Sequence, residues 1–288
     1  MKDQARVLRE LIKSEYDNDN FQVITITSGK GGVGKTSFTV NLAYALEKLE
    51  KRVLILDADL ALANVNIMLG EKPEYNLIHV LQGEKSINEI IYTSKYGFKY
   101  IPASSGVEKL ANLSAKEQLY LINSLKDIAL NFDFMLIDTS AGISEIVVNF
   151  CLSADKTIVI TTPEPTSTAD AYAISRILLE YKTDMMELGL LVNMVPSVEE
   201  AKRIYEGIDR VLRKFTGKGV EFYGYVRKDE KLPLSIKEGF LLLDKNRKTK
   251  YSQDVFSFAE FLATGKRKAQ RTNFWQKFFN NLIKIKEE

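Results

Sequence analysis

The chain has little of the residue types that build disulfide frameworks and metal sites. Its 288 residues include one cysteine, Cys151, and one histidine, His79. A single cysteine excludes an internal disulfide and any CxxC metal or iron–sulfur site. Cys151 lies in the apolar stretch VVNFCLSAD, which is typical of a small core residue, and a lone histidine without a cysteine nearby makes a poor metal site. We therefore expect neither side chain to carry chemistry.

Long hydrophobic runs are also missing. No apolar stretch approaches the ~20 residues of a membrane span, and the first residues lack the apolar core of a secretory signal. We expect a cytoplasmic protein. The net charge of +2 hides an asymmetry, because residues 266–288 carry seven basic and two acidic residues, so this end is +5 and the rest of the chain is −3. The net charge of residues 1–265 therefore does not favour DNA binding, whereas the positive charge of residues 266–288 attracts anions.

Short runs rich in Val, Ile and Leu alternate along the chain with segments of helical periodicity. Near-continuous apolar runs are typical of strands buried on both faces of a parallel sheet. The pattern predicts an α/β fold with a doubly wound, mostly parallel sheet over residues 21–263, flanked by short helical appendages. The predicted strands are QVITIT, RVLILD, FKYIPA, DFMLID, KTIVIT, LGLLVN and VEFYGYV. The appendages are a helix over residues 1–16 with a linker at 17–20, and a basic linker at 264–272 before a helix over 273–286.

The segment SGKGGVGKTS follows the first predicted strand. It satisfies the pattern G-x-x-x-x-G-K-[ST] between a strand and a helix, which is the setting that this phosphate-binding motif requires. Its glycines let backbone N–H groups close around phosphate oxygens, Lys35 contacts the β- and γ-phosphates, and Thr36 ligates Mg²⁺. We expect ATP and Mg²⁺ as cofactors. The ATP-binding residues are Gly29, Lys30, Gly31, Gly32, Val33, Gly34, Lys35, Thr36 and Ser37.

Acidic residues follow two further predicted strands. Asp57 and Asp59 come directly after RVLIL, and Asp138 ends the strand in DFMLID. One aspartate after a strand is more often a turn residue, but ligands of open α/β sheets bind at the carboxyl ends of the strands. Three aspartates in this order after a phosphate-binding loop therefore favour a catalytic site with Mg²⁺.

A second lysine, Lys30, gives the loop the form KGGVGKT, which resembles the deviant Walker A motif of the MinD/ParA ATPases. The resemblance implies that Lys30 reaches the partner's nucleotide in a dimer formed with ATP. It also implies that Asp59 positions the attacking water, that Asp57 lies near the Mg²⁺ shell and that Asp138 is the Walker B carboxylate before a second switch around Gly142. The implied catalytic residues are Lys30, Lys35 and Asp59, and the implied metal residues are Thr36, Asp57 and Asp138.

The resemblance also bears on the nucleotide base. Asn193 ends the strand LGLLVN at the position that hydrogen-bonds adenine in the family, and no guanine motif N-K-x-D follows it, so ATP is favoured over GTP. The chain departs from the family further on. Division-type relatives commonly have proline after the strand VEFYGYV, and Arg227 stands there instead, which puts the stacking of the base in doubt.

The end of the chain, TNFWQKFFNNLIKIKEE, has the pattern of an amphipathic helix. One interpretation is a helix packed on the domain, because most amphipathic helices are core elements. The basic linker and the bulky aromatic residues favour a helix that lies on an anionic membrane surface, and MinD-like proteins bind membranes in their ATP state in this way. The residues expected to meet lipid are Phe274, Trp275, Phe278, Phe279, Leu282 and Ile283.

The beginning of the chain is similar to one branch of the family. Residues 3–9, DQARVLR, match the DQAxxLR motif of FlhG proteins (also called FleN or YlxH), as do the stretches DADLALANVNIMLG, IDTSAGIS and TTPEPTSTADAYA. The resemblance implies that the first helix activates the GTPase FlhF, with Gln4 able to orient water in trans. The partner-activating candidates are Asp3, Gln4, Leu8 and Arg9. The alternative interpretation is that this helix only packs against the domain.

The sequence thus predicts an ATP-dependent, dimerising and membrane-associating switch that regulates flagellar number or placement. The implied partners are an FlhF-type GTPase and either flagellar switch-complex proteins or a flagellar transcription activator, with no direct DNA contact. A MinD-type division-site regulator, a ParA-type DNA-segregation ATPase and a binding module that holds ATP without hydrolysis are the alternatives. A carrier of metal clusters is excluded by the single cysteine.

Overall fold

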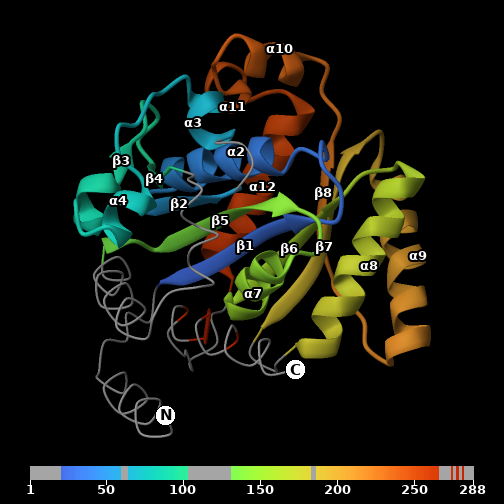
Figure 1. Cartoon of the computed structure of the whole chain (residues 1–288). Helices are drawn as coiled ribbons and strands as arrows, with labels where there is room; N and C mark the ends of the chain where they lie inside the picture. Colours follow the sequence, from blue (N-terminus) through green and yellow to red (C-terminus); the bar gives the residue numbers. More distant parts are fainter. Residues whose placement is uncertain are drawn as a thin grey trace, which may run out of the picture.

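In the computed structural model an eight-stranded sheet forms the centre of the protein (Figure 1). The structure describes residues 21–59, 64–102, 131–182 and 186–265, together with Phe274, Lys277, Phe278 and Asn281. The strand order is β3-β4-β2-β5-β1-β6-β7-β8, and all neighbours are parallel except the edge pair β3 and β4. The strands are β1 (Gln22–Ser28), β2 (Val53–Ala58), β3 (Tyr92–Thr93), β4 (Lys99–Ile101), β5 (Phe134–Ala141), β6 (Lys156–Thr161), β7 (Glu187–Val195) and β8 (Glu221–Arg227).

The predicted strands are confirmed, because each of the seven apolar runs coincides with one of these strands. Among the strands that the structure describes, only the two-residue edge strand β3 was not anticipated. The residues of β2 and β6 are buried along their whole length. Because helices cover both faces of these strands, their sequences need not alternate between polar and apolar residues.

Two layers of helices enclose the sheet (Figure 1). One core packs the sheet against α7, α8 and α9, and the other packs it against α2 and α12. The longer helices are α2 (Lys35–Lys48), α7 (Glu145–Ser153), α8 (Pro165–Tyr181), α9 (Val198–Thr216) and α12 (Lys250–Thr264). The shorter ones are α3 (Asn64–Leu69), α4 (Leu77–Leu81), η1 (Ile87–Ile90), α10 (Lys231–Lys237) and α11 (Leu242–Lys245).

Helix ends follow local sequence signals. The side chain of Ser197 accepts a hydrogen bond from the backbone N–H of Glu200 at the start of α9, and Gly217 ends that helix with a φ of 69°. Thr249 caps α12 in the same manner, and Pro165 occupies the first turn of α8. Hydroxyl caps satisfy free N–H groups, and glycine adopts the left-handed conformation without strain. None of the described helices is both long and apolar enough to cross a bilayer.

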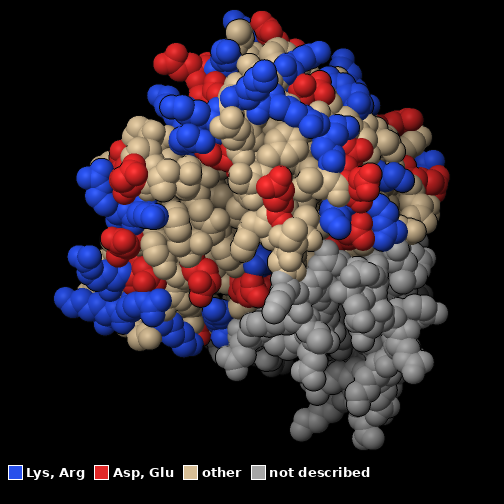
Figure 2. Space-filling view, turned by 180° about the vertical axis from the view of Figure 1, so that it is seen from behind, with Lys and Arg blue, Asp and Glu red and all other residues tan. Residues whose placement is uncertain are grey.

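Charged side chains of both signs share the described surface in the view from behind (Figure 2). Lys and Arg stand beside Asp and Glu around a largely uncharged centre, and basic side chains are more frequent towards the upper part of this face. Charges of mixed sign weaken long-range attraction of a polyanion. This face therefore adds no support to the DNA-segregation alternative.

Candidate functional site

The phosphate-binding loop joins β1 to α2. Gly34 precedes the helix with a φ of 86°, which glycine adopts without strain, and a Cβ there would lie 2.7 Å from Nδ2 of Asn193. The loop therefore needs glycine at this position both for its conformation and for the close approach of Asn193. The first turn of α2 carries Lys35 and Thr36, so both side chains start from the positive end of a 14-residue helix.

Lys35 is buried and bonded inside the loop. Its Nζ donates a hydrogen bond of 2.9 Å to Oγ of Ser28, the last residue of β1. Burial lowers the pKa of the Lys35 ammonium, while the nearby carboxylates Asp138 and Asp59 oppose this change. A buried cation at the start of a helix, in a glycine-rich loop, is a suitable contact for phosphate oxygens.

Asp138 contributes a carboxylate that faces the start of α2. It lies in β5 between β2 and β1, and its Oδ2 accepts a hydrogen bond of 2.6 Å from Oγ1 of Thr36. Its Oδ1 accepts a second one, of 3.2 Å, from Thr39 one turn further along α2. Burial raises the pKa of Asp138 to about 6, although these hydrogen bonds and the charge of Lys35 act in the other direction. Thr39 was not anticipated from sequence, because it lies outside the motif.

Asp57 neighbours Asp138 in the register of β2 and β5. It is fully buried and accepts hydrogen bonds from the backbone N–H groups of Asp59, Asn64 and Val65. Burial and the charge of Asp138 raise its pKa to about 7, while the backbone hydrogen bonds lower it. Two buried carboxylates beside a threonine hydroxyl are oxygen ligands of the kind that Mg²⁺ prefers, so these residues fit a magnesium ion.

Asp59 is oriented by a residue that sequence reasoning missed. Nδ2 of Asn64, the first residue of α3, donates a hydrogen bond of 2.7 Å to Oδ2 of Asp59. Asn64 is part of the stretch DADLALANVN, so its spacing from Asp59 was visible, but an asparagine has no sequence signal that separates this role from a helix cap.

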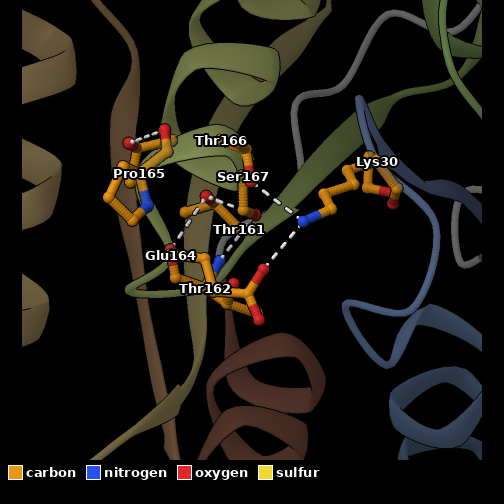
Figure 3. Close-up of polar contacts among 9 residues, drawn as sticks. Lys30, Thr161, Thr162, Glu164, Pro165, Thr166 and Ser167 are labelled. Carbon is orange, nitrogen blue, oxygen red and sulfur yellow. Dashed lines mark hydrogen bonds and ion pairs between the residues drawn. The ribbon is translucent and has the colours of Figure 1, made fainter.

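Lys30 is engaged within its own chain (Figure 3). Its Nζ lies 2.8 Å from Oε2 of Glu164 and 2.9 Å from Oγ1 of Thr166, both at the start of α8. The neighbouring turn is stabilised by Ser167, whose Oγ accepts a hydrogen bond from the N–H of Thr162. Glu164 and Thr166 lie in TTPEPTSTADAYA, but nothing in that stretch indicates a bond to the phosphate-binding loop.

The candidate base-binding residues have partners of their own. Nδ2 of Asn193 donates to the carbonyl of Val33 in the phosphate-binding loop at 2.8 Å. Arg227 forms two side-chain hydrogen bonds with Asp254 of α12, and its own N–H donates to the same carboxylate. The guanidinium of Arg227 is thus held by α12. A hydrogen bond from Asn193 to adenine stays a prediction.

The C-terminal residues that the structure describes are packed on the domain, and contact of this segment with lipid stays a prediction. Phe274 and Phe278 are buried in the core on the α7 side of the sheet. Trp275, Phe279, Leu282 and Ile283 lie outside the described residues, as do Asp3, Gln4, Leu8 and Arg9 of the predicted N-terminal helix. Phe274 and Phe278 pack against the ring of Phe150 on α7. This contact removes their apolar surface from water, as contact with lipid would.

Comparison with known proteins agrees with this geometry. Residues 21–186 match the family described as AAA domain. The chain is 36% identical over 217 residues to the "Antiactivator FleN" of Pseudomonas aeruginosa, covering 75% of this chain and 77% of that protein. It is 33% identical over 271 residues to the "Flagellum site-determining protein YlxH" of Helicobacter pylori, covering 92% and 91%. The structure of the septum site-determining protein MinD complexed with Mg-ADP from Pyrococcus horikoshii has a TM-score of 0.68 at 25% identity, over 85% of this chain and 96% of that one.

Proposed function

The chain belongs to the FleN/YlxH branch (FlhG) of the MinD/ParA family of P-loop ATPases, and we propose that it is an ATP-dependent switch that regulates the number or placement of flagella. Its enzymatic activity is ATP hydrolysis. The observation that carries the proposal is similarity to FleN and YlxH over most of the chain, combined with a phosphate-binding loop whose Thr36 donates a hydrogen bond to the β5 carboxylate Asp138.

The site residues have separate tasks in this proposal. Lys35 and the loop N–H groups bind the phosphates, and Asn64 holds Asp59 so that its carboxylate can orient the attacking water. When bound, Mg²⁺ neutralises charge that develops on the phosphates. Thr36, Asp57 and Asp138 are the residues that would hold it.

Dimer formation requires Lys30 to change partners. Glu164 and Thr166 hold its ammonium within one chain, and the side chains of Lys30 and Glu164 are 38% and 66% exposed. An ion pair this exposed contributes only about 0.2–1 kcal/mol, so phosphate of a second protomer's nucleotide can compete for the lysine. This supports an ATP-dependent homodimer in which Lys30 acts across the interface.

Membrane association in this proposal uses the C-terminal helix. Its aromatic residues and basic flanks suit an anionic lipid surface. Because Phe274 and Phe278 are buried against the domain, the helix must leave the domain before these rings can enter lipid. One helix binds weakly, and a dimer presents two, which raises the apparent affinity through avidity.

The partners follow from the branch of the family. The stretch DQARVLR supports activation of an FlhF-type GTPase by the first helix, with Gln4 as the group supplied in trans. The names of two relatives, an antiactivator and a flagellum site-determining protein, support a flagellar transcription activator or flagellar switch-complex proteins as further partners.

Two experiments test the proposal. In the host bacterium, replacing the gene by a Lys35→Ala version should change the number or position of flagella counted by electron microscopy. In vitro, GTP hydrolysis by the host's FlhF should rise with the full chain, but not with Gln4→Ala or with residues 1–20 removed. Normal flagella together with misplaced division septa would instead favour a MinD-type division regulator.

A further inference from the structure

Ser28 is the last residue of β1, and its hydroxyl has two partners in the phosphate-binding loop. Its Oγ donates a hydrogen bond of 2.7 Å to the backbone carbonyl of Lys30 and accepts one of 2.9 Å from Nζ of Lys35. A carbonyl can only accept and an ammonium can only donate, so the direction of both bonds is fixed. Ser28 itself is fully buried. One buried hydroxyl therefore links the side chain of one signature lysine to the backbone of the other.

The backbone around Ser28 is fixed by its neighbours. The Ser28 carbonyl accepts a hydrogen bond of 2.9 Å from the N–H of Gly142, and Ser28 pairs with Ala141 in the register of β1 and β5. A Cβ at Gly29 would lie 2.3 Å from the backbone carbonyl oxygen of Asp170, so the loop lies directly against α8 at this point. The Ser28 hydroxyl is thus attached to a part of the chain that contacts both β5 and α8.

Lys35 needs an anchor of this kind to act on phosphate. Its ammonium stands at the end of a flexible four-carbon stem and has three N–H donors. Ser28 accepts a hydrogen bond from this ammonium, which leaves two donors for phosphate oxygens. A partner on a fixed part of the chain removes orientations in which the ammonium points elsewhere. Less conformational freedom is then lost when a phosphate binds, which raises the affinity.

We propose that Ser28 is a positioning residue of the ATPase, which holds the Lys35 ammonium in place for the β- and γ-phosphates. Ser28 acts through Lys35, without a contact of its own to the nucleotide. The inference rests on the proposed function only as far as ATP binding is concerned, and it does not depend on a dimer, on lipid or on a flagellar partner. It adds a residue that lies one position before the glycine-rich loop.

A double-mutant cycle tests whether Ser28 acts through Lys35. We expect Ser28→Ala to lower the affinity for ATP with Mg²⁺ about tenfold, which is the factor for loss of one hydrogen bond to a charged group. In a Lys35→Ala background the same substitution should change the affinity by less than about twofold, because the ammonium that it positions is gone. Titration of a fluorescent ATP analogue measures all four proteins. An equal loss with and without Lys35 overturns the proposal.

Ser252 offers a matched control for the removal of a buried hydroxyl. It is also fully buried, and its Oγ donates a hydrogen bond of 2.7 Å to the carbonyl of Asn246 and accepts one of 2.8 Å from Thr249. Ser252→Ala therefore deletes the same atom with the same kinds of bond at the start of α12. It should lower the melting temperature and leave the affinity for ATP within about twofold. If Ser252→Ala weakens ATP binding as much as Ser28→Ala, the loss comes from packing and the proposal fails.

A measurement without nucleotide covers the case in which Lys35→Ala binds no ATP. Exchange of the Lys35 ammonium hydrogens with water can be followed by ¹⁵N NMR, and Lys35→Arg identifies the signal. Buried, hydrogen-bonded groups exchange only when they open, so Ser28→Ala should accelerate this exchange at least about fivefold, whereas Ser252→Ala should not. Exchange at the parent rate in Ser28→Ala overturns the proposal. If the parent protein bound no ATP, the proposed function would fail, but faster exchange in Ser28→Ala would still show that Ser28 holds Lys35.

Discussion

Oγ1 of Thr36 donates a hydrogen bond of 2.6 Å to Oδ2 of Asp138, a residue 102 positions further along the chain. This bond joins the start of α2 to β5 and brings together a hydroxyl and a carboxylate, the two groups that would hold the proposed magnesium ion. Each of the two groups has the other as its hydrogen-bond partner in this structure.

Removal of this hydroxyl should uncouple nucleotide binding from Mg²⁺. We expect Thr36→Ala to lower the affinity for ATP measured with Mg²⁺ by about 10- to 100-fold, while the affinity measured with EDTA changes little. Titration of a fluorescent ATP analogue under both conditions checks this. Thr39→Ala is the comparison, because Thr39 bonds the other oxygen of Asp138 without being a predicted metal ligand; a loss of equal size in both variants would contradict the assignment.

Affinity for Mg²⁺ and ATP should depend on pH through the two buried carboxylates. The pKa values of Asp57 and Asp138 are raised to about 7 and about 6, so both groups bind protons that a cation must displace. We expect the affinity to fall as the pH drops from 8 to 6. Isothermal titration calorimetry in buffers of different ionisation enthalpy would measure the released protons; no proton release at pH 6.5 would be inconsistent with these pKa values.

The same raised pKa values predict how the stability of the ligand-free protein depends on pH. An acid whose pKa is higher in the folded than in the unfolded state binds more protons when folded, so the free energy of unfolding decreases as the pH rises from about 4 to about 7. Asp57→Asn removes one such group. The melting temperature of this variant should therefore decrease less between pH 5 and pH 7.5 than that of the parent protein, as differential scanning calorimetry can determine.

Lys30 should control dimer formation, and its partners on α8 should only tune it. In an Asp59→Ala background that slows hydrolysis, we expect Lys30→Ala to abolish the ATP-dependent dimer. Glu164→Gln should leave it intact and shift its dissociation constant by no more than about fivefold, because the Lys30–Glu164 pair is largely solvent-exposed. Sedimentation velocity over a range of protein concentrations measures both effects. A dimer that survives Lys30→Ala would argue against a role for this lysine across the interface.

Asn64 should affect turnover more than binding. Its amide orients the Asp59 carboxylate, so Asn64→Ala should reduce the rate of phosphate release by about 10- to 100-fold and leave ATP affinity within about twofold. Asn66→Ala is a suitable control on the same helix, since the Asn66 amide contacts the carbonyl of Glu71 instead. If the two variants hydrolyse ATP at the same rate, Asn64 has no part in positioning Asp59 for catalysis.

The sequence alone determined the local features of the fold, which depend on residues close together along the chain. Apolar runs predicted seven of the eight strands in the described part of the chain, because burial on both faces requires continuous Val, Ile and Leu. The spacing of Gly29, Gly34, Lys35 and Thr36 predicted the phosphate-binding loop, because a loop between a strand and a helix is built from consecutive backbone groups.

Only the tertiary structure decided which distant groups meet. The strand order β2-β5-β1-β6 brings Asp57, Asp138 and the loop after Ser28 to one edge of the sheet, and it places the start of α8 within reach of Lys30. The C-terminal helix shows the limit most clearly. Its amphipathic pattern suits lipid and protein equally, because both remove apolar surface from water, and the pattern could not reveal that α7 offers Phe150 and Asn149 as a matching surface for Phe278.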